Sequence, residues 1–352
     1  MPRIAVLPGD GIGVEVTRQA VKVLRRVAAD AQLELGLDER DFGAGRYIRT
    51  GVAITEAELA ELETEYDAIL LGALGDPRVP DHAHARAILG GLRARLDLYI
   101  DLRPIRLLDP SLSSLGHAAQ PVDLVVYGEN AEGTGVGIGG QLHRGTSDEV
   151  ALDEGVSTRK GVERLLRAAF EHAQSVGPRR VALAEHPEAM PHRSDLWRRA
   201  FAEVGAEYPD VERGVVHVET LASDLVFHPA RYGVIVAPSL IAGMMSHLAA
   251  ALAGRPWLVP RAELHPGRPG LFRPMHGPAH DLVGTDRANP VGAILAAALL
   301  LDRLGFAREA ARIEAAVRRS IRLGQTTPDL DGTLGTDAVG DWICRELGEA
   351  DL

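Results

Sequence analysis

The chain has 352 residues, of which 46% are hydrophobic and 25% charged, and its formal net charge is −11 at pH 7. This composition is that of a soluble globular protein with room for two domains, and it excludes extended disorder. The acidic balance argues against a general affinity for nucleic acids or anionic membranes. The single cysteine, Cys344, excludes an intrachain disulfide and indicates a reducing compartment.

The chain also lacks sequence signals for export or membrane insertion. Its first residues, MPRIAVLPGDGIG, form a short apolar run without the long core of a secretory signal, so a cytoplasmic location is expected. The longest strongly apolar run, residues 290–301, falls short of the roughly 20 residues that span a bilayer. We expect it to form a buried helix.

Aliphatic and periodic segments alternate along the chain. Short aliphatic or β-branched runs predict buried strands at residues 3–7, 68–71, 124–126, 181–184 and 234–237. Apolar residues three and four positions apart predict helices at residues 14–29, 56–65, 83–96, 160–175 and 194–204. This alternation predicts an α/β fold, with loop-like crossings between domains near residues 107–119 and 256–269.

A glycine-rich turn, PGDGIG at residues 8–13, follows the first predicted strand and precedes the first predicted helix. Its position is that of a dinucleotide phosphate loop. However, the G-x-G-x-x-G spacing is absent, and Asp10 would repel a pyrophosphate. A tight strand-to-helix turn explains the same residues equally well, so both interpretations stay open.

A second segment is more specific: HGPAHD at residues 276–281, followed by ANP at 288–290. It resembles the NAD loop of the isocitrate, isopropylmalate and tartrate dehydrogenases, and the similarity covers nearly the whole chain. VPDH at 79–82, IGG at 138–140 and GT at 145–146 resemble the tartrate and D-malate dehydrogenase branch most closely. The resemblance implies the isopropylmalate dehydrogenase-like fold, with two α/β domains of which the first is discontinuous.

The resemblance also implies a domain organisation. Residues 1–101 and 254–352 would form the cofactor-binding domain, and residues 102–253 the central substrate and dimerisation domain. An arm near residues 133–154, rich in glycine at its start, would join two chains into a homodimer.

NAD is the cofactor that the resemblance implies. His276 would contact the adenine, Asn289 its edge, and Asp281 the ribose hydroxyls, where a carboxylate favours NAD over NADP. From the residues alone, Asp281 could equally cap the following turn. The other cofactor positions that the resemblance implies are Ile12, Gly72, Ala73, Leu74 and Gly277.

Two arginines, Arg93 and Arg103, predict recognition of a small carboxylic acid. A guanidinium group can bind a carboxylate through two parallel hydrogen bonds, although isolated arginines are usually solvated. Both positions match the substrate arginines of the family, so the resemblance implies that they bind the substrate.

The metal positions of the family are replaced. The family uses Mg²⁺ or Mn²⁺, held by aspartates, to polarise a keto oxygen during β-decarboxylation. Aligned with that pattern, the three aspartate positions carry Glu219, Gly243 and His247. Glycine offers no ligand and imidazole suits softer metals, so we expect poor Mg²⁺ and Mn²⁺ binding.

The acid-base positions are replaced as well. Gly128 stands where the family has a third substrate arginine, Gly135 where it has a tyrosine, and His186 where it has a lysine. We therefore predict that the usual oxidative decarboxylation is absent. The two glycines are expected to enlarge the substrate pocket. Arg273 adds a further difference, because the family usually has an acid there.

Three functions stay open for this diverged centre. His186, Glu219 and His247 could converge across a dimer interface and bind Zn²⁺ or Fe²⁺, or they could simply fill the old pocket. His186 could instead act as the base in metal-free hydride transfer on a hydroxy or keto acid. Finally, the fold could serve a non-redox enzyme or an NAD- or anion-binding protein in a specialised pathway.

Overall fold

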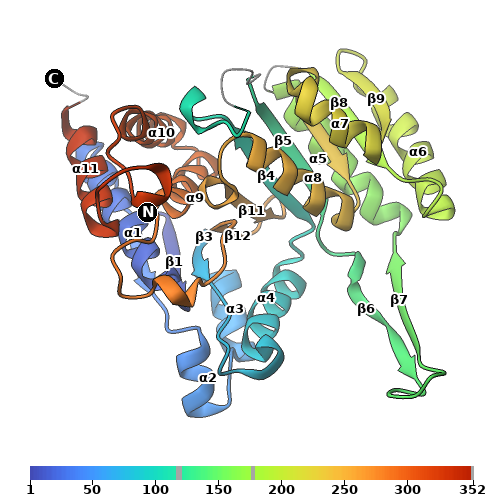
Figure 1. Cartoon of the computed structure of the whole chain (residues 1–352), viewed down its shortest axis with the longest axis horizontal. Helices are drawn as coiled ribbons and strands as arrows, with labels where there is room; N and C mark the ends of the chain where they lie inside the picture. Colours follow the sequence, from blue (N-terminus) through green and yellow to red (C-terminus); the bar gives the residue numbers. More distant parts are fainter. Residues whose placement is uncertain (116–120, 176–178, 350–352) are drawn as a thin grey trace. The chain divides into compact units, whose positions relative to one another are not determined.

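A computed structural model describes residues 1–115, 121–175 and 179–349, and the chain divides into two compact units (Figure 1). Unit 1 comprises Met1–Asp97, Leu107–Ala119 and Ala253–Leu352, and unit 2 comprises Leu98–Arg106 and Gln120–Leu252. Strands and helices alternate in both units, which confirms the predicted α/β class.

The segment Leu107–Ala119 belongs to unit 1, whereas the sequence analysis placed it in the central domain. Its contacts explain this difference. The Arg318 guanidinium donates hydrogen bonds to the backbone carbonyls of Leu107, at 3.5 Å, and Leu108, at 2.9 Å. The backbone of Gly254 also packs against Leu112.

Unit 1 contains a five-strand run in the order β2-β1-β3-β12-β11. The strands are β1 Arg3–Gly9, β2 Gly36–Glu39, β3 Ala68–Ala73, β11 Pro260–Leu264 and β12 Gly270–Pro274. Pairs in this run are parallel except the antiparallel pair β11 and β12. All six residues of β3 are buried, which accounts for its continuously apolar sequence.

The helices of unit 1 are α1 Gly13–Asp30, α2 Ala44–Thr50, α3 Glu56–Thr64, α4 Ala83–Leu96, α9 Val291–Arg303, α10 Ala307–Arg322 and α11 Thr336–Glu349. Helix α9 is buried along most of its length, as its sequence predicts. Within the described residues, no helix is both long and apolar enough to cross a membrane.

Unit 2 contains a second five-strand run, in the order β4-β5-β10-β8-β9. The strands are β4 Ile100–Arg106, β5 Asp123–Glu129, β8 Arg180–Glu185, β9 Glu212–His217 and β10 Val234–Ala237. The pair β4 and β5 is antiparallel, and the other pairs are parallel. The helices of this unit are α5 Arg159–Ser175, α6 Pro191–Ala206, α7 Val218–Phe227 and α8 Ser239–Leu252.

A two-stranded hairpin extends from the rest of unit 2 and is drawn in green in Figure 1. It consists of β6 Gly133–Leu142 and β7 Val150–Val156, paired antiparallel. Apolar side chains on both strands are exposed, including Ile138, Leu142 and Leu152.

The five strands predicted from aliphatic runs and the five helices predicted from periodicity are all present, with ends shifted by a few residues at most. The sequence analysis gave no prediction for the helices α2, α7 and α10, and among the strands it missed β2, β9, β11 and β12. Two of these strands, β2 and β9, lie at the ends of their strand runs and carry polar or exposed residues, so they lack the apolar signature of a buried strand. The other two strands are short and contain arginine and proline.

Candidate active site

The glycine-rich turn after β1 is organised by the buried carboxylate of Asp10. This group accepts hydrogen bonds from the backbone N–H of Ala44, at 2.6 Å, and of Gly75, at 2.8 Å, and lies 2.8 Å from His84 Nε2. It therefore joins the start of α1, the first turn of α2 and the loop after β3. These partners assign Asp10 a structural role inside unit 1.

Replacing Asp10 with asparagine should lower the free energy of unfolding by about 1.5 kcal/mol, because one acceptor oxygen would become a donor facing N–H groups. Urea unfolding followed by circular dichroism measures this loss. Asp81→Asn provides the control, because Asp81 is exposed with no side-chain partner among the described residues, and asparagine tolerates its positive φ of 52°. Equal stability of the two variants would contradict the assigned role of Asp10.

The predicted cofactor segments meet at this turn within unit 1. The Ile12 N–H donates to the carbonyl oxygen of Pro278 at 2.8 Å, and the Asp10 N–H donates to that of Ala73 at 2.7 Å. A Cβ atom added to Gly11 would lie only 2.0 Å from the Pro278 oxygen, so glycine is required for this approach. Gly72 likewise packs against the Pro8 carbonyl, while Leu74 is half-buried beside it.

The residues predicted to contact NAD differ in their availability. The Asp281 side chain is exposed and has no hydrogen-bond partner in the described chain. It does not cap the turn at residues 280–282. His276 Nδ1 lies 2.9 Å from the Gly277 carbonyl, whereas its buried Nε2 has no partner among the described residues. Burial lowers the pKa of His276, which keeps its imidazole neutral.

Asn289 is used within the chain. Its side-chain oxygen accepts from the Val291 N–H at 3.0 Å at the start of α9, and its amide nitrogen donates to Asp329 at 3.0 Å. Any contact with an adenine must therefore be made by the remaining amide hydrogen or by the backbone. The predicted role of Asn289 is untested by this geometry.

Arg93, predicted to bind substrate, pairs with the fully buried Glu263 through two contacts of 2.5 and 2.8 Å. Arg261 and Arg273 each approach the same carboxylate at 3.3 Å. Burial opposes ionisation of Glu263, but these three guanidinium groups hold its pKa well below the usual range. The arginine at position 273 thus belongs to a buried ion cluster within unit 1.

Arg103 also has internal partners, all in unit 2. Its guanidinium donates to the Asp101 carboxylate, with the closest contact at 2.7 Å, and to the Ser246 hydroxyl at 2.5 Å. Its Nη1 lies 3.5 Å from His247 Nδ1. Asp101 and Arg103 are both buried. A substrate carboxylate would have to compete with Asp101 for this arginine.

The positions where the resemblance places the metal aspartates do not fit Mg²⁺ or Mn²⁺ in this chain. Glu219 is exposed, and Gly243 has no side chain. His247 turns its Nδ1 to the Gly243 carbonyl oxygen at 2.9 Å. One carboxylate and one imidazole do not supply the oxygen ligands that a hard divalent cation needs.

Of Gly128 and Gly135, which were expected to enlarge the pocket, only one leaves space. A Cβ atom added to Gly128 would lie 2.9 Å from Ala242 Cβ, because α8 packs directly on β5. The expected enlargement at Gly128 is therefore wrong: the helix fills it. At Gly135, an added Cβ would meet only the Glu132 carbonyl oxygen, at 3.9 Å, among the described residues, so this position is open.

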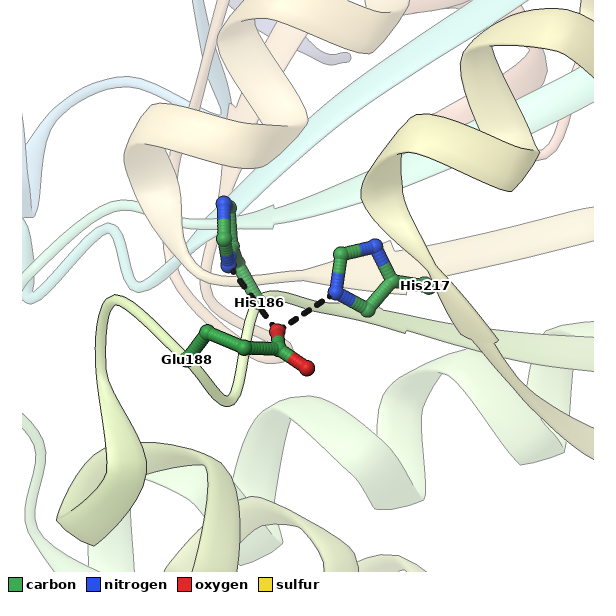
Figure 2. A group of neighbouring side chains, drawn as sticks. All are labelled: His186, Glu188 and His217. Atoms are coloured by element: carbon green, nitrogen blue, oxygen red, sulfur yellow. Dashed lines mark hydrogen bonds and ion pairs between the residues drawn. The ribbon is translucent and has the colours of Figure 1, made fainter.

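His186 belongs to a cluster with two residues that the sequence analysis missed, Glu188 and His217 (Figure 2). Glu188 Oε2 lies 2.6 Å from His217 Nε2 and 3.4 Å from His186 Nδ1. The hydrogen bond to Glu188 raises the pKa of His217. Glu219 Oε2 lies 3.6 Å from His217 Nδ1, on the other side of that ring.

The strand arrangement explains this cluster. Strands β8 and β9 are parallel neighbours with Glu185 opposite His217, so both histidines lie at the carboxyl ends of adjacent strands. Such ends commonly carry the ligand-binding residues of α/β folds. Within one chain the group contains His186 but neither Glu219 nor His247 of the predicted set.

Comparisons with known proteins agree over almost the whole chain. The sequence model of the isocitrate/isopropylmalate dehydrogenase family matches residues 3–343. The 3-isopropylmalate dehydrogenase of Thermobifida fusca is 38% identical over 350 residues, covering 99% of this chain and 98% of that protein. The enzyme of the same name from Clavibacter sepedonicus is 41% identical over 356 residues, covering 99% of both.

Solved structures show the same similarity. The isocitrate dehydrogenase of Methylococcus capsulatus has a TM-score of 0.88 at 30% identity, covering 99% of both chains. A β-decarboxylating dehydrogenase of Thermococcus kodakarensis has a TM-score of 0.81 at 32% identity, covering 99% of this chain and 97% of its own.

Proposed function

Because this chain belongs to the isocitrate/isopropylmalate dehydrogenase family, we propose that it is an NAD-binding oxidoreductase acting on a small hydroxy or keto carboxylic acid. We further propose that it does not perform the Mg²⁺-assisted decarboxylation of the family. Its closeness to the tartrate and D-malate branch stays a prediction, since the relatives described above are named 3-isopropylmalate, isocitrate and β-decarboxylating dehydrogenases.

The observation that carries the proposal is the replaced donor set. Decarboxylation in this family needs a cation that stabilises negative charge on the keto oxygen. Here the corresponding positions offer one exposed glutamate, a glycine and a histidine that turns to a backbone carbonyl. These groups do not hold Mg²⁺ in one chain, so the enolate would have no cation to stabilise it.

The cofactor side favours retention of NAD. Asp281 offers a carboxylate that could accept hydrogen bonds from ribose hydroxyls, and the buried His276 Nε2 could accept one from an adenine amino group. Bound NAD would supply the hydride acceptor for a hydroxy acid. When no metal is bound, His186, half-exposed at the end of β8, is the candidate base for the hydroxyl proton, and metal-free hydride transfer needs only that one acceptor.

A set of His186, Glu219 and His247 completed by two chains also stays a prediction, with Zn²⁺ or Fe²⁺ as its metal. The exposed apolar side chains of β6 and β7 support a homodimer, since such surfaces commonly mark interfaces. Oligomeric state in solution tests that part directly.

A second candidate function is favoured by the arginines. Arg93 and Arg103 already bind the buried carboxylates of Glu263 and Asp101. If neither exchanges its partner for a substrate, the chain would be a non-redox enzyme or an NAD- or anion-binding protein. The two candidates differ in one observable, because only the oxidoreductase produces NADH.

The test is an assay with NAD, Mg²⁺ and each of malate, tartrate, isocitrate and isopropylmalate, with NADH followed by absorbance. We expect no ordinary turnover, because the metal ligands are replaced. The same assay in EDTA, with a wider set of hydroxy acids, should reveal any metal-free activity. Ordinary Mg²⁺-dependent turnover with one of the four acids would contradict the proposal.

Thermal unfolding with NAD separates the two candidates further. Binding to the folded state raises stability by about 2.7 kcal/mol at a hundredfold excess over Kd. A rise in melting temperature without NADH formation would favour the binding protein. If millimolar NAD does not raise the melting temperature, the chain does not bind NAD, and both candidate functions lose their cofactor.

A further inference from the structure

We propose that His186, Glu188 and His217 form a Zn²⁺ site in unit 2. Two imidazoles and one carboxylate are the ligand set of a zinc centre that keeps an open coordination position. In this chain the three ligand atoms all lie within 4.8 Å of one another (Figure 2). This set differs from the predicted one, sharing only His186.

The spacing suits Zn²⁺. With Zn–N and Zn–O distances of about 2.0–2.1 Å, ligand atoms at tetrahedral angles lie about 3.3 Å apart. His186 Nδ1 and Glu188 Oε2 are separated by 3.4 Å. Glu188 Oε2 and His217 Nε2 are 2.6 Å apart and would have to open by less than an ångström. Glu188 can make this movement, because its side chain is 69% exposed on the loop between β8 and α6.

The orientation of His186 also favours a cation. The Ala189 N–H approaches His186 Nδ1 at 3.4 Å, so this nitrogen carries its lone pair and no hydrogen, and a metal ion bound there would replace this long contact. The same nitrogen faces a carboxylate oxygen of Glu188. Two acceptors that face each other need a proton or a metal ion between them. A metal ion satisfies His186, Glu188 and His217 together, without placing positive charge on two imidazoles whose centroids are 5.0 Å apart.

Glu219 completes the arrangement as a positioning residue. If His217 binds the metal through Nε2, its Nδ1–H is directed to Glu219 Oε2, now 3.6 Å away. Carboxylates commonly orient metal-bound histidines in this way and increase their basicity.

The experiment measures metal binding, so its outcome does not depend on redox activity. The full chain, purified without a polyhistidine tag and stripped with EDTA, is dialysed against Zn²⁺ or Mg²⁺ and analysed for metal. We expect one Zn²⁺ per chain and no Mg²⁺. Co²⁺ in place of Zn²⁺ should give the visible spectrum of a tetrahedral site.

Variants locate the ion. Glu188→Gln and His217→Ala should each weaken Zn²⁺ binding at least a hundredfold, and Glu219→Gln about tenfold, as expected for an outer carboxylate. His192→Ala, which removes an exposed histidine of α6, is the matched control and should bind as the wild type does. Circular dichroism of the metal-free variants confirms that they fold.

Three results would overturn the proposal: a wild-type chain without stoichiometric Zn²⁺, binding that survives in both Glu188→Gln and His217→Ala, or binding that is lost in His247→Ala but not in His217→Ala. The last result would assign the metal to the set of His186, Glu219 and His247.

Discussion

Replacing Glu263 with glutamine should lower the free energy of unfolding by about 3 kcal/mol at pH 7, because removing one partner of a buried ion pair leaves the other charges uncompensated. Glu263 is completely buried, and Arg93, Arg261 and Arg273 surround its carboxylate. Glutamine keeps the shape of the side chain and part of its hydrogen bonding. The loss of unfolding free energy therefore measures the contribution of the negative charge of Glu263.

The effect should depend on pH with a defined sign. The pKa of Glu263 is well below its ordinary value in the folded state, because the attraction of three arginines exceeds the cost of burial. Its stabilising contribution is therefore complete above the unfolded pKa of about 4.3 and is lost as the pH falls through the folded pKa. The difference between wild type and Glu263→Gln should stay constant above about pH 5 and narrow in acid.

Urea unfolding at several pH values measures this difference. Glu207→Gln is the matched control, since Glu207 pairs with Arg167 on the surface and half of its side chain is exposed. Exposed pairs contribute little, so this variant should unfold like the wild type. A similar small effect at Glu263 would mean that its arginines are satisfied without it.

The fold could be predicted further than the site. Periodicity located α1, because its buried face repeats at a fixed spacing, and continuous aliphatic runs located buried strands such as β3. The partners of Asp10 could not be found this way. These partners are Ala44, Gly75 and His84, which lie 34, 65 and 74 positions after Asp10 in the sequence. Only the folded unit brings them to its carboxylate.

The same limit explains why the sequence analysis missed Glu188 and His217, two ligands of the proposed zinc site. His186 attracted attention because it stands at the position of a lysine in the resemblance. His217 was not recognised, because it ends β9, a polar strand at the end of its run that has no apolar signature in the sequence. Without a prediction of β9, the sequence analysis could not place His217 beside His186. One signal was available: HPE at 186–188 and HVE at 217–219 each place a histidine two residues before a glutamate.

The sequence also did not reveal that Arg93 and Arg103 pair with carboxylates of the protein itself. The residue type at 93 and 103 predicts carboxylate recognition, and both side chains do bind carboxylates. Those carboxylates belong to the protein. A guanidinium group fits an aspartate or glutamate as well as a substrate, so residue type alone cannot distinguish a binding site from a buried ion pair.

Introducing an arginine at position 128 should destabilise the chain, whereas introducing a tyrosine at position 135 should not. An added Cβ at Gly128 would meet Ala242 Cβ at 2.9 Å, and the longer side chain would have to part α8 from β5. We expect Gly128→Arg to lower the free energy of unfolding by about 2–3 kcal/mol, the usual cost of overpacking. Gly135→Tyr extends into open space and should unfold like the wild type.

A double-mutant cycle tests the physical reason. Ala242→Gly removes the methyl group that Gly128→Arg would meet, at a cost of about 1 kcal/mol for glycine inside a helix. If packing causes the loss, the double variant should be more stable than the sum of the single losses predicts. If the two single losses simply add in the double variant, the contact between position 128 and Ala242 is not the cause of the destabilisation. Coupling would show that Ala242 of α8 limits the size of the side chain at position 128, so a larger residue there needs a compensating change in α8.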